Sequence, residues 1–437
     1  MPTDLAEPAQ PVGLAAAFAR RGIHYGWAVA AVTFLTMLVT AGAVGAPGVL
    51  ILPLQKEFGW ATSEISSALA VRLLLFGLMA PFAAAFMNRF GVRPVALVAL
   101  SLIAASIIGS FFMTQLWQLV LLWGFVLGFG TGLTAMVLGA TVATRWFVQR
   151  RGLVVGLLTA STATGQLVFL PLLAALTEQV GWRAAMTFVL GMIALAAVGI
   201  LALMRDRPAD VGLAPFGATQ IVPAPAQAAS LGAMLASPIV ALRDAAKTST
   251  FWILFGTFFV CGLTTNGLIG AHMIAFCSDH GLPEVKAAGV LAMMGLFDLV
   301  GTTLSGWLTD RYDPRKLLFV YYLLRGLSLI WLPFTDFSLL TLTIFAVFYG
   351  LDWIATVPPT LRLTTEAFGE RDAPVVFGWI AAGHQIGAAT AAMTAGLLRV
   401  AQGRYLEAFV IAGATGIAAA AAALLVRRRA AETFQRA

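Results

Sequence analysis

The sequence predicts an all-α polytopic membrane protein in which twelve transmembrane helices form two pseudo-symmetric six-helix bundles. Three observations support this fold class: the composition, the number of long apolar segments and an internal repeat. Of the 437 residues, 60% are hydrophobic and only 11% are charged, and the mean hydropathy is +0.89. Such a chain would not be soluble as a globular protein, which places it in a lipid bilayer.

Twelve apolar segments have the length that a membrane-spanning helix needs. A helix must run for about 20 residues to cross about 30 Å of hydrocarbon. The predicted segments are 26–54, 63–87, 94–113, 117–143, 152–175 and 183–204 in the first half, and 250–276, 286–308, 316–334, 338–361, 373–398 and 404–426 in the second. Pro358-Pro359, near the end of segment 338–361, allows a kink there.

One long polar interval separates the two sets of helices. The expected parts are a cytoplasmic tail at 1–25, a six-helix bundle at 26–204, a cytoplasmic linker at 205–249, a second bundle at 250–426 and a cytoplasmic tail at 427–437. The linker is rich in proline and alanine, which suits a mobile connector, and its last part, LRDAAKTSTFW, has the mixed polarity of a short interfacial helix. The first tail lacks the apolar core and cleavage site of a signal peptide.

The two halves repeat each other at an offset of 222 residues. Four glycine pairs keep this spacing, namely Gly59 and Gly281, Gly128 and Gly350, Gly156 and Gly378, and Gly165 and Gly387. The same offset joins two charged loops, one with Asn88, Arg89 and Arg93 and the other with Asp310, Arg311 and Arg315. The chain is therefore a tandem duplication.

Lysine and arginine are distributed unequally between the two sets of loops. With the N-terminus placed inside, 20 of the 27 basic residues fall in cytoplasmic loops and tails, five fall outside and two lie within helices. Cytoplasmic loops of membrane proteins carry such an excess of positive charge. We expect a multi-pass protein of the cell membrane, the inner membrane in a bacterium, with both termini in the cytoplasm.

The residue patterns of several other protein classes do not occur in the sequence. It has no HExxH, P-loop or nucleophile elbow and no Cys/His metal spacing, so we expect neither an enzyme nor a cofactor or metal. The basic residues lie in short loops instead of on one face, which argues against a nucleic-acid partner. Cys261 and Cys277 lie about 24 Å apart along one helix, too far for a disulfide, and we expect them to be packing residues.

The second charged loop has the spacing G-x-x-x-D-R-x-x-x-R-K, beginning at Gly306. Arginines prefer the cytoplasmic end of a helix, and Asp310 can offset them while capping a neighbouring helix N-terminus. The alternative is a stray basic loop. The spacing resembles the loop between helices 2 and 3 of major facilitator superfamily transporters. The resemblance implies a gating role for both loops, that is for Asn88, Arg89, Arg93, Gly306, Asp310, Arg311 and Arg315. The first copy is degraded, with Ala84 for the glycine and Asn88 for the aspartate.

A second resemblance concerns the stretch RWFVQRRGLVVGLLTASTATG, which leads into segment 152–175. It resembles the helix 5 start of the monocarboxylate porter and oxalate/formate exchanger branch in Phe147, Arg150, Arg151, Leu153, Gly156 and Gly165. Val154 and Ser161 depart from that pattern. The branch also binds carboxylate through basic residues that this chain lacks, since Thr302 stands where the porters carry arginine, so the resemblance does not identify the substrate. The G-x-x-x-G-P pattern of proton-coupled drug exporters is missing as well, because Gln166 follows Gly165.

Five ionisable residues lie inside the predicted helices: Arg72, Asp298, Arg325, Asp352 and His384. A charge at mid-membrane costs at least about 2.5–3.5 kcal/mol, so each needs a partner or a water-filled cavity. One interpretation is structural: the charges form static ion pairs that fix helix packing. Helix rise places Arg325 at the same depth in the membrane as Asp298 and Asp352, so we expect it to pair with one of these aspartates. The functional interpretation assigns substrate binding to Arg72, Arg325 and His384, with Asn266 and Gln166 as weaker candidates, and proton coupling to Asp298, Asp352 and His384.

These patterns favour a secondary active transporter that moves a small, monocarboxylate-like organic anion by alternating access. With His384 neutral, two arginines balance two aspartates, so an incoming monoanion favours uptake of a proton with it. We expect a small-molecule substrate, protons and the bilayer as partners, and a monomer. The alternative is efflux of an amphipathic drug-like compound or metabolite. A non-transporting receptor or scaffold would need a large extramembrane domain, which the sequence does not contain.

Overall fold

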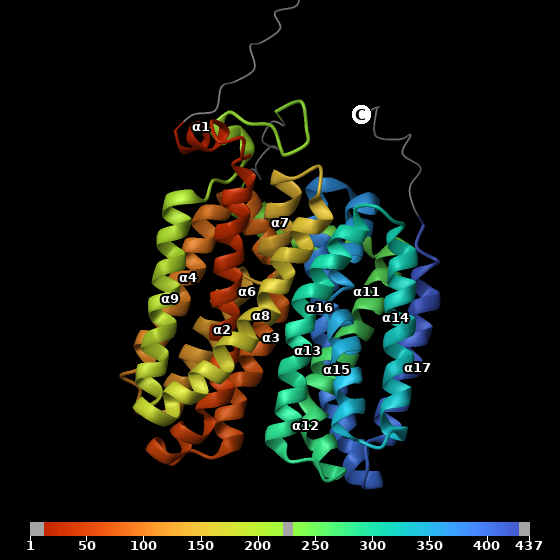
Figure 1. The fold of residues 1–437 in the computed structure, drawn as a ribbon. Helices are drawn as coiled ribbons and strands as arrows, with labels where there is room; N and C mark the ends of the chain where they lie inside the picture. Colours follow the sequence, from red (N-terminus) through yellow and green to blue (C-terminus); the bar gives the residue numbers. More distant parts are fainter. Residues whose placement is uncertain (1–12, 222–229, 428–437) are drawn as a thin grey trace, which may run out of the picture.

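The computed structural model describes residues 13–221 and 230–427, apart from some side chains within the helices. The regular structure of these residues is helical, and two bundles of helices stand side by side (Figure 1). The first bundle consists of α2 (Gly26–Phe58), α3 (Thr62–Phe90), α4 (Val92–Ser110), α5 (Leu116–Leu119), a π-helix (Val120–Val126), α6 (Leu127–Leu133), α7 (Met136–Trp146), α8 (Arg151–Val180) and α9 (Trp182–Leu203). The second consists of α11 (Ser249–Gly262), a π-helix (Leu263–Ile269), α12 (Gly270–Asp279), α13 (Glu284–Thr309), α14 (Pro314–Trp331), a 3-10 turn (Leu332–Phe334), α15 (Leu339–Asp352), α16 (Val357–Gln402) and α17 (Leu406–Ala423).

The long described helices of the two bundles make twelve membrane passes. Ten helical stretches are long and apolar enough to cross a membrane. One of them, Leu339–Gln402, has 64 residues and turns at Gly369, where φ is 79° and ψ is 160°, so it supplies two passes. The 30-residue α8 is the remaining one. Large apolar side chains such as Leu195, Val198 and Leu201 lie exposed on α9, where only lipid makes such exposure favourable.

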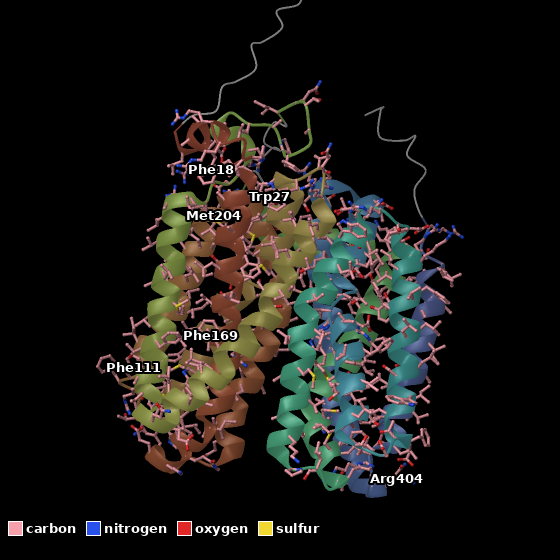
Figure 2. The ribbon with its side chains drawn as sticks, in the orientation of Figure 1. Phe18, Trp27, Phe111, Phe169, Met204 and Arg404 are labelled. Atoms are coloured by element: carbon pink, nitrogen blue, oxygen red, sulfur yellow. The ribbon has the colours of Figure 1, made fainter. Side chains whose placement is uncertain are left out.

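The two ends of the molecule differ. We name the linker end after the segment that joins the bundles; α1 (Leu14–Ala19) also lies there, and Phe18 and Met204 mark this end in Figure 2. Arg404 marks the opposite end (Figure 2). The ribbons of the two bundles run close together near the linker end and diverge toward the opposite end (Figure 1).

Glycine contacts confirm the duplication of 222 residues. A Cβ on Gly128 would lie 3.3 Å from Arg72 Cα, and one on Gly350 would lie 2.8 Å from Met294 Cα. Both residues of the second contact lie 222 positions after those of the first. The same holds between the bundles, where a Cβ on Gly156 would lie 3.2 Å from Thr303 Cα and one on Gly378 would lie 2.6 Å from Pro81 Cα. Both halves therefore use glycine at equivalent positions to bring helix backbones together.

Several predicted boundaries are wrong. Segment 117–143 is not one helix, because the chain leaves helical geometry at Thr134 and Ala135. Segment 338–361 is broken between Asp352 and Val357, since the prolines that follow cannot donate to the preceding turn. In the linker, the helix is α10 (Leu231–Ala245), so LRDAAK is its end and not a separate helix.

The linker helix α10 contacts both halves. It packs against α3 of the first bundle and α16 of the second, and Trp379 Nε1 of α16 donates a hydrogen bond to the Pro238 carbonyl at 2.8 Å. Residues 222–229 of the predicted linker, and most of the two predicted tails, lie outside the described residues. The described part of the linker is thus held against the bundles.

Candidate functional site

The two halves are joined at the linker end by α8 and α13. The Asp310 carboxylate accepts hydrogen bonds from the backbone N–H groups of Gly152 at 2.7 Å and Leu153 at 3.0 Å, in the first turn of α8. This confirms the expectation that Asp310 caps a neighbouring helix N-terminus. Two glycines allow the approach, because a Cβ on Gly152 would lie 2.5 Å from the Gly306 carbonyl oxygen and one on Gly306 would lie 2.2 Å from the Gly152 carbonyl oxygen. A negative charge at a helix N-terminus is favourable.

Further polar contacts surround this junction. Arg151 Nη2 of α8 lies 2.6 Å from Glu370 Oε1 of α16, and Arg362 donates to the Thr309 carbonyl. A cavity of about 280 Å³ lies among these residues. The linker end is therefore closed by a capped helix, an ion pair between the halves and glycine-mediated packing.

The two predicted gating loops make different contacts. Gly306 and Asp310 of the second loop reach the other half, whereas Arg311 lies over the Trp307 ring at 3.9 Å and Arg315 pairs with Asp313 at 2.7 Å. In the first loop, Asn88 Oδ1 accepts from Arg145 at 2.8 Å, Arg93 donates to the Leu201 carbonyl at 2.7 Å, and Arg89 lies over Phe90 at 5.7 Å. These recorded contacts of the first loop stay within the first half.

Arg325 lies at the centre of a buried polar cluster in the second half. Its Nε donates to Asp352 Oδ2 at 2.6 Å, which confirms the predicted pairing with one of the two aspartates. Nη1 donates to Cys261 Sγ at 3.1 Å and to Thr264 Oγ1 at 3.4 Å, and Nη2 donates to the backbone carbonyls of Asp352 and Trp353. A guanidinium has five N–H groups. All five are used within the protein, and the side chain is 0% exposed.

This cluster stabilises the break between α15 and α16. Asp298 Oδ1 accepts from the Ile354 N–H at 3.1 Å and from Thr302 Oγ1 at 2.6 Å, and Ser305 donates to the Ala355 carbonyl at 2.5 Å. A broken helix in a membrane needs such partners for its freed backbone groups. Asp298 Oδ2 and Asp352 Oδ1 have no hydrogen-bond partner among the described residues.

His384 lies where the halves meet. It is 1% exposed, and neither ring nitrogen has a hydrogen bond of standard geometry among the described residues, although the Cys261 thiol interacts with the ring through a hydrogen bond and through charge. The ring packs against Phe258 at 5.2 Å and lines a cavity of about 20 Å³ with residues of both halves. Cys261 is free, as predicted, but it also accepts from Arg325 and is more than a packing residue.

Arg72 is a buried cation on α3. The residue is 7% exposed, its Nη1 donates to the Val44 carbonyl of α2, and its Nε has no hydrogen-bond partner in the described part of the chain. Among the described residues, no carboxylate lies within ion-pair distance of the guanidinium. Arg72 and Arg325 therefore differ, although both are lone arginines in apolar helices.

The two weaker candidates come from a π-helix of the second half and from α8 of the first. Asn266 lies exposed in the π-helix Leu263–Ile269, and π-helical turns often occur at functional sites. Gln166 lies on α8, and its side chain is outside the described residues. Sequence reasoning missed the interruption before α7, for which the glycine-rich stretch GFGTGLT was the available signal.

Two six-helix bundles from an internal repeat, with buried charges beside broken helices and one closed end, are the features of a membrane transporter that works by alternating access. The family model described as Major Facilitator Superfamily matches residues 32–360 and 285–437, and the chain belongs to this family. It is therefore a multi-pass membrane transporter of a small molecule and not an enzyme.

The chain is similar to two transporters in sequence and to a third in structure. Monocarboxylate transporter 13 of Rattus norvegicus is 26% identical over 393 residues, which cover 89% of this chain and 86% of that protein. The uncharacterized MFS-type transporter YcxA of Bacillus subtilis is 26% identical over 73% of this chain and 74% of its own length. The crystal structure of the human organic anion transporter MFSD10 has a TM-score of 0.69 at 16% identity, covering 91% of this chain and 99% of that one. The last likeness shows the fold.

Proposed function

We propose that the protein transports a small organic anion, monocarboxylate-like in size and charge, together with a proton. The observation that carries the proposal is Arg72, which is buried between α2 and α3 without a carboxylate partner among the described residues. An unpaired cation is costly inside a membrane protein, and an anionic substrate would offset that cost. The names of the relatives, a monocarboxylate transporter and an organic anion transporter, support the same substrate class.

Arg325 has a different role in this proposal. All five of its N–H groups are bonded within the second half, so a substrate carboxylate could bind it only by displacing Asp352 or the backbone carbonyls. We assign it to the structure of the helix break. Substrate binding therefore belongs to Arg72, with Asn266 and Gln166 as further proposed contacts from the helices around the interface.

The proton is assigned to His384, with Asp298 as a second carrier. The ion pair between Arg325 and Asp352 is neutral as a unit. Of the four charged residues in the membrane-spanning helices, this leaves the positive charge of Arg72 and the negative charge of Asp298, which sum to zero. A bound monoanion would then leave one negative charge in excess, and a proton restores neutrality. His384 faces the cavity between the halves, and its ring nitrogens have no hydrogen bond of standard geometry among the described residues, so it is the more accessible carrier.

The proposal also includes the orientation of the protein in the membrane and the conformational state that the structure represents. The excess of basic residues places the linker end in the cytoplasm. With the linker end closed by Asp310, the protein is then in a state that exchanges substrate with the outside. Opening of the linker end must separate α8 from α13 and α3 from α16, and Asn88, Arg89, Arg93, Arg311 and Arg315 flank that motion.

The test is uptake of radiolabelled monocarboxylates into proteoliposomes, with and without an inward proton gradient. We expect uptake to rise as external pH falls. We expect His384→Ala to lose gradient-driven accumulation while retaining exchange of internal for external substrate. Uptake that is independent of pH in the unmodified protein would refute proton coupling, and absence of uptake for every carboxylate in the panel would refute the substrate class. Gradient-driven extrusion of amphipathic cations by the same vesicles would support the alternative of drug-like efflux.

A further inference from the structure

The first half contains a helix break that is not internally satisfied. α6 ends at Leu133 and α7 begins at Met136 with Ala135 as its N-cap residue, which has no side-chain acceptor. The hydroxyl groups of Thr131 and Thr134 bond to carbonyls of the preceding turn, a pattern that bends helices. The interruption lies 11 residues, about 16 Å, from the end of α7 and so within the membrane.

Two backbone donors are left at this break. Within the part of the chain that the structure describes, no hydrogen bond is made by the N–H groups of Met136 and Val137. Their counterparts 222 residues later are Pro358 and Pro359, which have no N–H at all. In the second half, proline therefore replaces the residues that would carry these N–H groups, whereas the first half keeps both N–H groups inside the helix bundle.

The open N-terminus of α7 lies beside an unpartnered side chain. The cavity of about 20 Å³ is lined by Ala135, Met136 and Val137 from the break, by Phe76, Gly77 and Ala80 from α3, and by Ala381, His384 and Gln385 from α16. A space of about 10–15 Å³ or more holds one water-sized group. Neither ring nitrogen of His384 has a hydrogen bond of standard geometry among the described residues, although the Cys261 thiol interacts with the ring.

The electrostatics of this cavity favour an anion. A helix N-terminus carries about half a positive charge, and its N–H groups point at any ligand that lies before it. Arg72 lies one helical turn, about 6 Å, before Phe76 on the same helix. Among the residues that the structure describes, no aspartate or glutamate lines the cavity.

We propose that the break between α6 and α7 is an anion-binding site, in which the N–H groups of Met136 and Val137 and the ring of His384 hold one oxygen of a carboxylate or a single halide ion. The two sources share the same chemistry, a compact acceptor of hydrogen bonds. A carboxylate at this site rests on the proposed function and places the substrate at the closed end of its path. A halide would make the site a separate, regulatory or co-transported ion site.

The experiment measures the thermal stability of the purified full-length protein in detergent at constant ionic strength, with sodium gluconate replaced stepwise by sodium formate or by sodium chloride. We expect a saturable rise in Tm with at least one of the two anions. Formate alone would indicate a carboxylate site, and chloride alone would indicate a halide site. No rise with either anion would overturn the proposal.

Substitutions at the N-cap position test the location. Ala135→Asp places a carboxylate where the ligand would bind, so we expect a higher Tm without added anion and at least a tenfold higher half-saturating anion concentration. Ala135→Asn should act in the same direction but more weakly. The matched control Ala135→Val adds similar bulk without an acceptor and should not raise the anion-free Tm. Equal anion-free Tm values for the Asp and Val variants would contradict capping.

Two further measurements separate this site from Arg72. Arg72→Met should raise the half-saturating carboxylate concentration for transport about tenfold to a hundredfold if the proposed function is correct, yet leave stabilisation by the anion within about threefold of the unmodified protein. If Arg72→Met removes the stabilisation and Ala135→Asp does not, the anion binds at Arg72 and the helix-break site is wrong. In crystals soaked with bromide, an anomalous peak is expected within hydrogen-bond distance of Met136 N and Val137 N, and a peak elsewhere alone would also refute the site.

Discussion

The two helix breaks occupy equivalent positions in the two halves, and their surroundings have opposite character. In the second half the break is lined by Asp298, Thr302, Ser305, Arg325 and Asp352. The counterparts 222 residues earlier are Phe76, Ala80, Ala83, Ile103 and Gly130, which are all apolar or glycine. Ile103 and Gly130 are also neighbours, because a Cβ on Gly130 would lie 2.8 Å from Ile103 Cγ1. The ion pair between Arg325 and Asp352 is the equivalent contact in the second half.

The difference shows how a duplicated fold divides its tasks. In the second half, buried side chains bond to backbone groups freed at the interruption and two prolines remove N–H donors, so this half is fixed around its break. In the first half, two N–H donors of α7 have no partner among the described residues, and Arg72 has a backbone carbonyl but no described carboxylate as partner. An unsatisfied polar group inside a membrane is costly, and transport can use it because the ligand supplies the missing contact.

The strongest test of this division is Arg325→Ile, which introduces the first-half residue at the centre of the second-half cluster. It leaves Asp352 as a buried charge without its partner, so we expect a loss of about 3–5 kcal/mol of stability. Thermal and denaturant unfolding in detergent would measure it. The double variant Arg325→Ile/Asp352→Gly also removes the orphaned charge and should be more stable than the single variant. If it is less stable, the ion pair is not what makes the single variant unstable.

The complementary exchange is Arg72→Met, which places the residue of Met294 at its first-half counterpart. Because Arg72 has no ionic partner among the described residues, its removal orphans no described charge, and stability should fall by less than about 1 kcal/mol. A charge-assisted contact contributes about 1.5–3 kcal/mol, so the half-saturating carboxylate concentration should rise about tenfold to a hundredfold. Unfolding and proteoliposome uptake measured on the same preparation check both. A large loss of stability would mean that Arg72 is structural.

A smaller effect is expected for Ser305→Ala, which again introduces the first-half residue, Ala83. The change removes the hydrogen bond to the Ala355 carbonyl and leaves that buried acceptor unpaired, at a cost of about 1–2 kcal/mol. Thermal unfolding measures it, with Ser328→Ala, whose hydroxyl bonds within its own helix, as control. Equal losses of stability in the two variants would show that the hydrogen bond of Ser305 does not stabilise the helix break.

The smallest effect is expected at the surface ion pair between the halves. Glu370 is 60% exposed at its side chain, and exposed pairs contribute about 0–1 kcal/mol. Glu370→Gln should therefore raise the labelling rate of a cysteine placed at Val155, in the linker-end cavity, by less than about fivefold. Asp310→Asn removes a half-buried charge from the α8 N-terminus and should raise that rate more. The reverse order would assign closure of the linker end to the ion pair.

Much of this fold follows from local sequence physics. The duplication, the Asp310 cap and the pairing of Arg325 with an aspartate could be derived from spacing and helix rise. The Pro358-Pro359 pair indicated a kink, but sequence could not show that Arg325, Asp298 and Ser305 converge on the freed backbone groups. Arg72 and Arg325 look alike in sequence, because each is one arginine among apolar residues, and only tertiary contacts distinguish the saturated guanidinium from the unpaired one.

The glycine contacts between the halves have a thermodynamic consequence. At Gly156 and Gly378 the helices meet through backbone atoms, so closing these contacts immobilises no side chain there. Long side chains would each lose up to about 2 kcal/mol of rotamer entropy on closure. A carrier must return through each of its states in every cycle, and a state that is several kcal/mol too stable would hold the population. Backbone contacts without rotamers to freeze keep the entropy of the closed and open states nearly equal, which lets the cycle turn over in both directions.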